Sequence, residues 1–82
     1  MYQIVFENRV KKDWKKVAQS EHLRLRATIN DLAISPRPSG CSKLYTGDYR
    51  IRVGDYRVIY SIDDSAQVIA ILAIGHRKEV YE

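Results

Sequence analysis

The sequence predicts an α+β fold in the order β-α-α-β-β-β, with a helical hairpin packed on one face of a small, mostly antiparallel four-stranded sheet. Apolar residues recur at helical spacing in the first half of the chain, and prolines and a glycine end this pattern at residues 35–40. The second half alternates between apolar and polar residues, as strands do. We expect residues 1–82 to form a single domain.

The first half of the chain contains one expected strand and two expected helices. The β-branched and aromatic segment Tyr2–Phe6 predicts the strand. A helix should follow within residues 7–19, and Ser20 can cap the second helix. The apolar stripes are Val10, Trp14 and Val17 in the first helix, and Leu25, Ile29, Leu32 and Ala33 in the second.

The first helix also carries a run of lysines, Lys11, Lys12, Lys15 and Lys16. They could form a nucleic-acid surface, but a solvated helix face is the more common meaning of such a run, and we favour it.

Three strands are expected in the second half, at Tyr49–Val53, Tyr56–Ile62 and Gln67–Gly75. The last is almost wholly apolar and predicts a strand buried on both faces. Gly54-Asp55 fits a two-residue hairpin turn of type II′ or I′. Counting outward from this turn pairs Val53 with Tyr56, Arg52 with Arg57, Ile51 with Val58 and Arg50 with Ile59.

The hairpin places two sets of side chains on opposite faces. Tyr49, Ile51, Val53, Tyr56, Val58 and Tyr60 should face the helices, and Arg50, Arg52 and Arg57 should lie on the other face. Two arginines opposite each other cost about 0.2–1 kcal/mol, so the cluster indicates an anion site, most simply for phosphate. The alternative is pairing with Asp48, Asp55 or Glu79.

The register of the last strand decides which residue joins these arginines. An odd number of residues in the loop at Asp63–Ser65 would place Ile71 opposite Arg57 and bring Arg77 to the arginines. An even number would bring His76 there instead. We expect Arg77.

Composition limits the function further. The chain has 14 basic and 10 acidic residues, a net charge of +4, which favours an anionic partner such as nucleic acid. Its single cysteine, Cys41, cannot form an intrachain disulfide and fits a cytoplasmic location. The longest apolar run, Val68–Ile74, is too short to span a membrane, so no membrane partner is expected. With His22 and His76 as its only histidines, the chain predicts no metal site and no cofactor.

The stretches "YRIRVGDYRVIYSID" and "VIAILAIGHRKEVY" resemble the core of the RelE toxins, in the RelE/ParE superfamily of toxin–antitoxin systems. The resemblance covers nearly the whole chain and includes the loop "SPRPSG" ahead of the basic hairpin. It implies a ribosome-dependent, metal-independent endoribonuclease, an mRNA interferase that cuts mRNA in the A site. The 2′-hydroxyl of a ribose attacks the adjacent phosphate and leaves a cyclic phosphate.

The resemblance also implies partners and site residues. The partners are a cognate RelB-like antitoxin, the ribosome and mRNA, with operator DNA bound only through the antitoxin complex. Arg50 and Arg52 match positions near the scissile phosphate, where some members have lysine, and Arg57 matches an arginine that stabilises the transition state. Arg77 matches a second phosphate-binding arginine, and Tyr81 matches a tyrosine that stacks on the substrate base.

Arginine stays protonated, so Arg50 and Arg52 are poor general bases. His76 and Glu79 are the remaining candidates for acid–base chemistry. The more common meanings of these residues are a partly exposed histidine at the end of a strand and a surface salt bridge from Glu79 to Arg77 or Lys78. Two other functions stay open: a ParE-like toxin that inhibits DNA gyrase, and a non-catalytic RNA-binding module. The arginines together with Tyr81 favour the interferase.

Overall fold

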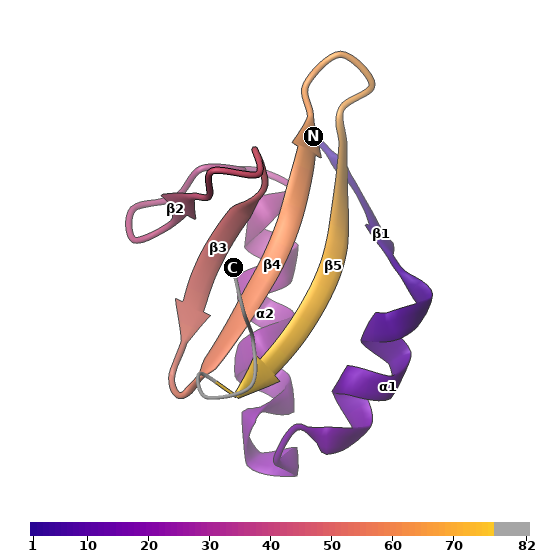
Figure 1. Cartoon of the computed structure of the whole chain (residues 1–82), viewed down its shortest axis with the longest axis vertical. Helices are drawn as coiled ribbons and strands as arrows, with labels where there is room; N and C mark the ends of the chain where they lie inside the picture. Colours follow the sequence, from indigo (N-terminus) through magenta and orange to yellow (C-terminus); the bar gives the residue numbers. More distant parts are fainter. Residues whose placement is uncertain (77–82) are drawn as a thin grey trace.

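The computed structural model describes residues 1–76, in which two α-helices precede most of the strands (Figure 1). The elements are β1 (Gln3–Phe6), α1 (Asn8–Lys16), η1 (Gln19–Glu21), α2 (His22–Leu32), β2 (Ser42–Lys43), β3 (Tyr49–Val53), β4 (Tyr56–Asp63) and β5 (Val68–His76). The predicted α+β class and element order are confirmed, with β2 as an addition. This strand is only two residues long, too short to leave a pattern in the sequence.

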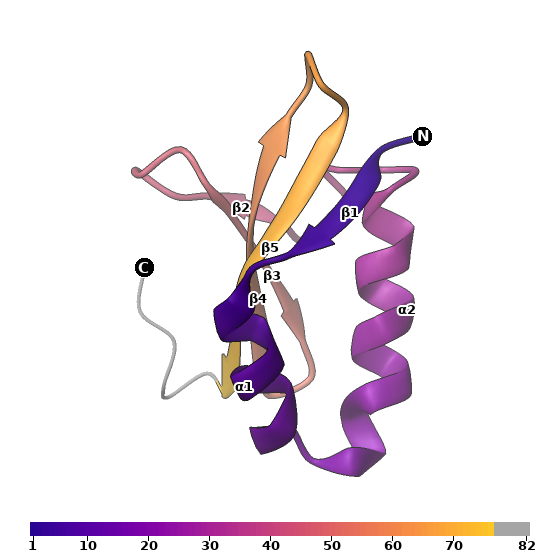
Figure 2. The ribbon, with the colours of Figure 1, turned by 90° about the vertical axis from the view of Figure 1, so that its right-hand side faces the viewer.

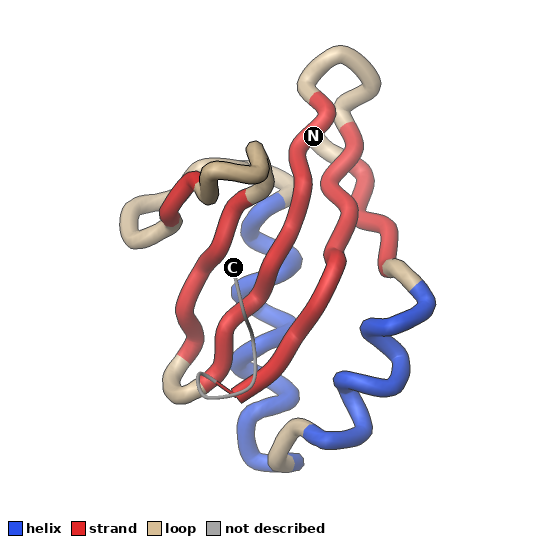
Figure 3. Tube along the Cα trace, viewed as in Figure 1, coloured by secondary structure: helices blue, strands red, loops and turns tan. Residues whose placement is uncertain are grey.

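The strands form one sheet in the order β1-β5-β4-β3-β2 (Figure 3). It therefore has five strands instead of the four expected. β1 runs parallel to β5, and the other neighbours are antiparallel. The last described strand, β5, thus lies beside the first strand, β1.

The main core lies between the sheet and α2, which runs along one side of it (Figure 2). Leu25, Ile29 and Leu32 of α2 are buried there, as their spacing predicts. The predicted inner face of the hairpin is confirmed: its members in the core are Tyr49, Ile51, Val53, Val58 and Tyr60, with Tyr56 packed against them. None of the helices within residues 1–76 is long and apolar enough to cross a bilayer.

α1 closes the core beside the end of β5 (Figure 1). β1 pairs with β5 only as far as Ile71, so the outer edge of β5 has no strand partner beyond that residue. The side chain of Asp13 in α1 takes the place of a strand partner there, because its carboxylate accepts a hydrogen bond of 3.0 Å from the backbone amide of Ile74. At the end of the same helix, the amide of Ala18 donates to the Tyr56 hydroxyl at 3.0 Å. Both bonds fix α1 to the end of the sheet that carries the arginines.

Two local expectations were wrong. Ser20 lies within η1 and does not cap α2, whose N-cap residue, Glu21, makes no side-chain capping bond. β5 is buried along its length only on the face toward α2, at Ile69, Ile71 and Ile74. On its other face Ala73 is buried, but Ala70 and Leu72 are half-buried. The reason is that α2 covers one side of the sheet, so the apolar residues on the other side form only a small cluster.

Candidate functional site

The β3–β4 hairpin has the predicted register. Arg52 pairs with Arg57, and Arg50 pairs with Ile59. Gly54 has a φ of +61°, while Asp55 does not adopt a positive φ. A positive φ at the first central position alone is the pattern of a type II′ turn, which decides between the two turn types left open. The turn therefore sets the alternation that separates the arginines from the core.

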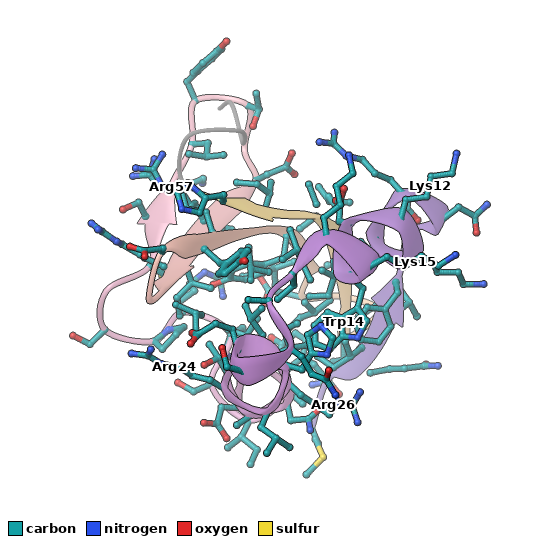
Figure 4. The ribbon with its side chains drawn as sticks, turned by 90° about the horizontal axis from the view of Figure 1, so that it is seen from below. Lys12, Trp14, Lys15, Arg24, Arg26 and Arg57 are labelled. Atoms are coloured by element: carbon teal, nitrogen blue, oxygen red, sulfur yellow. The ribbon has the colours of Figure 1, made fainter. Side chains whose placement is uncertain are left out.

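Arg50, Arg52 and Arg57, which we call the arginine face, point away from α2. Figure 4 shows Arg57 on one side of the sheet and Arg24 and Arg26 of α2 on the other. Arg52 is exposed, and Arg50 and Arg57 are half-buried. Arg52 donates to the carbonyl of its own turn residue Gly54 at 3.3 Å.

Arg52 and Arg57 lie opposite each other on neighbouring strands, and neither has an acidic partner among residues 1–76. Within residues 1–76 the ion pairs join Arg9 to Asp13, Arg24 to Glu21 and Arg37 to Asp64, and none involves Arg52 or Arg57. These two arginines therefore do not pair with Asp48 or Asp55. Glu79, the third candidate partner, lies outside the described residues. The uncompensated charge fits a site for an anion.

A small apolar cluster adjoins the arginines on the same face. Leu44, Ile59 and Ala73 are buried there, with Leu72 packed against them. Ile59 pairs with Arg50, and on the other side of β4 Arg57 pairs with Gly75, which has no side chain. The guanidinium groups thus lie beside apolar surface, where their attraction for an anion is stronger than in bulk water.

The register of β5 differs from both alternatives predicted. Ile71 pairs with Tyr60 and not with Arg57, whose partner is Gly75. Asp63 pairs with Val68, so four residues, 64–67, form the loop, and an even loop alone would bring His76 to the arginine face. A β-bulge near Ile59/Tyr60 adds one residue, Leu72, to β5 and reverses this alternation.

His76 consequently lies on the opposite face. It pairs with Tyr56, and the two rings meet edge to face with centroids 5.8 Å apart. The structure therefore brings Arg50, Arg52 and Arg57 together and separates His76 from them. Arg77, Glu79 and Tyr81 lie outside the described residues, so their roles stay predictions.

A second polar cluster, which sequence reasoning missed, lies where the loop after α2 meets the β4–β5 loop. Arg37 donates to Asp64 at 2.9 Å and to the Tyr49 hydroxyl at 3.1 Å, and the Tyr2 hydroxyl donates to Asp64 at 2.6 Å. The bonds from Arg37 and Tyr2 lower the pKa of Asp64, while the bond to Asp64 raises the pKa of Tyr2. The signal available was Arg37 between two prolines, but nothing in the sequence indicates its partner.

This cluster is anchored by a buried tyrosine. The Tyr60 hydroxyl donates to the carbonyl of Pro36 at 2.8 Å, and burial is the main reason that the pKa of Tyr60 is raised. The loop that carries Arg37 is thereby held against β4. For metal binding, the part of the chain that the structure describes brings no three His, Cys, Asp or Glu side chains together as a ligand group.

Comparison with known proteins adds the family. Residues 4–81 match the family model described as the ParE toxin of the type II toxin–antitoxin system parDE. The mRNA interferase toxin RelE of Escherichia coli K12 is 26% identical, with 98% of this chain and 90% of that protein covered.

Solved structures of toxin–antitoxin complexes have the same fold. The toxin in the archaeal RelE–RelB complex of Pyrococcus horikoshii superposes with a TM-score of 0.83 and 31% identity, covering 96% of this chain and 98% of that one. A chain of the RelBE2 complex of Mycobacterium tuberculosis superposes with a TM-score of 0.82 and 26% identity, covering 93% of this chain and 98% of that one. The isolated E. coli RelE toxin superposes with a TM-score of 0.78 and 25% identity, covering 93% of this chain and 84% of that one.

These likenesses, together with a basic face on this fold, define the class as a toxin of a type II toxin–antitoxin system. The chain belongs to the RelE/ParE superfamily, and within it to the RelE family of toxins.

Proposed function

We propose that this toxin is an mRNA interferase, a metal-independent endoribonuclease that cuts mRNA in the ribosomal A site and so inhibits translation. The observation that supports the proposal most directly is the arginine face, where Arg52 and Arg57 lie opposite each other without an acidic partner among residues 1–76. The names of the curated relatives, which are mRNA interferases, support the same activity.

The arginine face suits the chemistry of RNA cleavage. When a ribose 2′-hydroxyl attacks the adjacent phosphate, negative charge builds up on the phosphoryl oxygens as the bond to the 5′ oxygen of the next nucleotide breaks. The products are a 2′,3′-cyclic phosphate and a 5′-hydroxyl. Guanidinium groups that are already in place stabilise this charge without reorganisation. In our proposal Arg57 binds the phosphoryl oxygens, and Arg50 and Arg52 position the phosphate.

The remaining roles come from the resemblance to RelE toxins. Arg77 adds a second contact to the phosphate, and Tyr81 stacks on the base of the substrate, an interaction worth about 1–3 kcal/mol. Because His76 lies on the other face of the sheet, Glu79 is the better candidate for proton transfer. Positioning of the mRNA by the ribosome supplies much of the acceleration.

The proposed partners follow from the same family. Several of the structural neighbours are RelE–RelB complexes, which supports a RelB-like antitoxin that neutralises this toxin. Ribosome and mRNA are the targets, operator DNA is bound only through the antitoxin complex, and the toxin acts in the cytoplasm.

The second candidate is inhibition of DNA gyrase, which is favoured by one observation, the ParE name of the matching family model. Toeprinting on programmed ribosomes separates the two functions. Cleavage within the A-site codon by the purified toxin supports the interferase, and it should be absent when the ribosomes are left out. Intact mRNA together with inhibited supercoiling by gyrase would instead establish the ParE-like function. RNA binding without either effect would leave a non-catalytic module.

A further inference from the structure

The turn between β2 and β3 projects from the sheet on the side opposite α2 (Figure 2). In Figure 4 this turn stands at the top of the picture, on the side of the sheet that carries Arg57. The turn carries Tyr45, which is 92% exposed, the highest value among the exposed large apolar residues of the described chain, 1–76. An aromatic ring is thus presented to solvent on the side of the arginine face.

Backbone hydrogen bonds hold this turn in one shape. The amide of Leu44 donates to the carbonyl of Asp48 at 2.8 Å, and the amide of Gly47 donates to the carbonyl of Leu44 at 2.9 Å. Gly47 has a φ of +97°, the left-handed conformation that closes a three-residue hairpin loop of this kind. The backbone of Tyr45 is therefore already ordered, which lowers the entropic cost of binding a ligand to its ring.

The turn is also anchored beside the arginines. Leu44, the residue before Tyr45, is buried in the small apolar cluster together with Ile59 and Ala73. Ile59 in turn pairs with Arg50 of the arginine face. The arginine face, the apolar cluster and the turn therefore follow one another on a single surface of the sheet, and a ligand held by the arginines can extend along it to the turn.

The distance from the arginines to the turn suits a short piece of single-stranded RNA. Asp48, at the base of the turn, precedes Arg52 by four residues. In extended chain these residues span about 13 Å, at about 3.3 Å per residue, and stacked nucleotides follow each other at about 3.4 Å. If its scissile phosphate lies at Arg57, an RNA strand would therefore reach Tyr45 with a base about two to four nucleotides away.

The two ends of this surface differ in charge, which indicates the part of the ligand that each end binds. Arg52 and Arg57 are basic, whereas residues 44–48 include no basic residue and include the acidic Asp48. A phosphate is therefore disfavoured at the turn. The flat face of a nucleobase is not, because every base can stack on an aromatic ring whatever its hydrogen-bonding groups.

We propose that Tyr45 stacks on a base of the mRNA close to the scissile phosphate and thereby helps to select which sequences are cut. The proposal rests on the proposed interferase function and deepens it, because the arginines act on the phosphate of any nucleotide and Tyr45 acts on one base. It adds a contact on the β2–β3 turn to the stacking that we expect from Tyr81. Because a purine offers a larger face than a pyrimidine, cleavage should be faster when a purine lies at the contacted position.

The test scans the mRNA with an abasic nucleotide, placed at one position at a time around the scissile bond. Cleavage on programmed ribosomes is timed for the wild type, Tyr45→Ala, Tyr45→Phe and Phe6→Ala. Phe6→Ala is the matched control, because Phe6 is 52% exposed and lies in β1, at the opposite edge of the sheet from β2. Binding is measured separately, on ribosomes whose mRNA carries a methylated 2′-hydroxyl at the scissile bond and cannot be cut.

We expect Tyr45→Ala to slow cleavage and weaken binding by about 10-fold on intact mRNA. Tyr45→Phe keeps the ring, so it should behave like the wild type, and Phe6→Ala should change either value by less than about threefold. At one position the abasic nucleotide should slow the wild type by about the same factor as Tyr45→Ala does, and should slow Tyr45→Ala no further.

Equal sensitivity of the wild type and Tyr45→Ala to every abasic position would overturn the proposal, and so would a wild-type rate for Tyr45→Ala. Weaker binding of Tyr45→Ala to ribosomes without mRNA would also overturn it, and would assign the ring to ribosomal RNA. Binding without cleavage by the wild type would count against the proposed enzyme alone, since the binding measurements still decide the role of Tyr45. Absence of wild-type binding to programmed ribosomes would overturn both.

Discussion

The arginines on the two sides of the sheet have opposite surroundings. Arg37 is bonded to the carboxylate of Asp64 and the hydroxyl of Tyr49, and the loop that carries it is fastened to Tyr60. Arg52 and Arg57 are aligned with each other by the hairpin, and neither has an ion pair within residues 1–76. The charge of Arg37 is therefore balanced by a carboxylate, whereas Arg52 and Arg57 repel each other.

This difference separates stability from function. An arginine whose hydrogen bonds are satisfied within the protein has little capacity left for a ligand. Two arginines that repel each other raise the free energy of the folded state until an anion lies between them. If this interpretation is right, substitutions in the two places should affect different measurements.

The largest effect should come from Arg57→Ala. Because this guanidinium is the one we place on the phosphoryl oxygens, we expect A-site cleavage to fall by about 100-fold or more. The free energy of unfolding should not fall, because the substitution removes one of two opposed charges. Arg37→Ala should do the reverse, lowering the unfolding midpoint in urea while cleavage by the folded protein persists. Toeprinting and urea titration of both variants measure the two effects.

The contrast fails if Arg37→Ala reduces cleavage as strongly as Arg57→Ala does while both proteins remain folded. In that case the second cluster would belong to the active surface.

The next effect concerns the anchor of the Arg37 loop. Tyr60→Phe removes the hydroxyl that donates to Pro36 and leaves that carbonyl without its donor, so we expect the free energy of unfolding to fall by about 1 kcal/mol. Tyr45→Phe is the matched control, because Tyr45 is 92% exposed and should tolerate loss of its hydroxyl. Equal urea midpoints for wild type and Tyr60→Phe would show that the loop is held by other contacts.

The sequence predicts a region well when neighbouring residues determine its structure, and poorly when residues far apart in the sequence do. The arginine face follows from local rules, since a Gly-Asp turn and strict alternation determine which side Arg50, Arg52 and Arg57 occupy. The Arg37–Asp64 pair joins residues 27 apart, and no local pattern connects them. The side on which His76 lies depends on the bulge at Leu72, a single added residue in a uniformly apolar strand. Such a bulge leaves no trace in the periodicity.

A smaller effect should come from Arg52→Thr. Removing one of two opposed charges relieves repulsion, so we expect the free energy of unfolding to rise by about 0.2–1 kcal/mol while cleavage decreases. Arg52→Lys keeps the charge and should leave stability nearly unchanged. A stability gain in both variants would mean that charge repulsion is not its cause.

The smallest effect should appear at Asp64, in the exposed pair with Arg37. The folded-state pKa of this carboxyl is lowered, first by the hydrogen bond from Arg37 and then by that from Tyr2. A lowered pKa contributes stability above the ordinary aspartate pKa, and this contribution is lost as the pH falls through the folded-state value.

Asp64→Asn should therefore be slightly less stable than wild type at pH 7, and the difference should shrink from about pH 5 downward. Urea titrations between about pH 7 and pH 3 measure it, with the exposed Asp31→Asn as control. A difference that stays constant over this range would mean that the ionised carboxylate of Asp64 does not stabilise the fold and that Arg37 is held by Tyr49 alone.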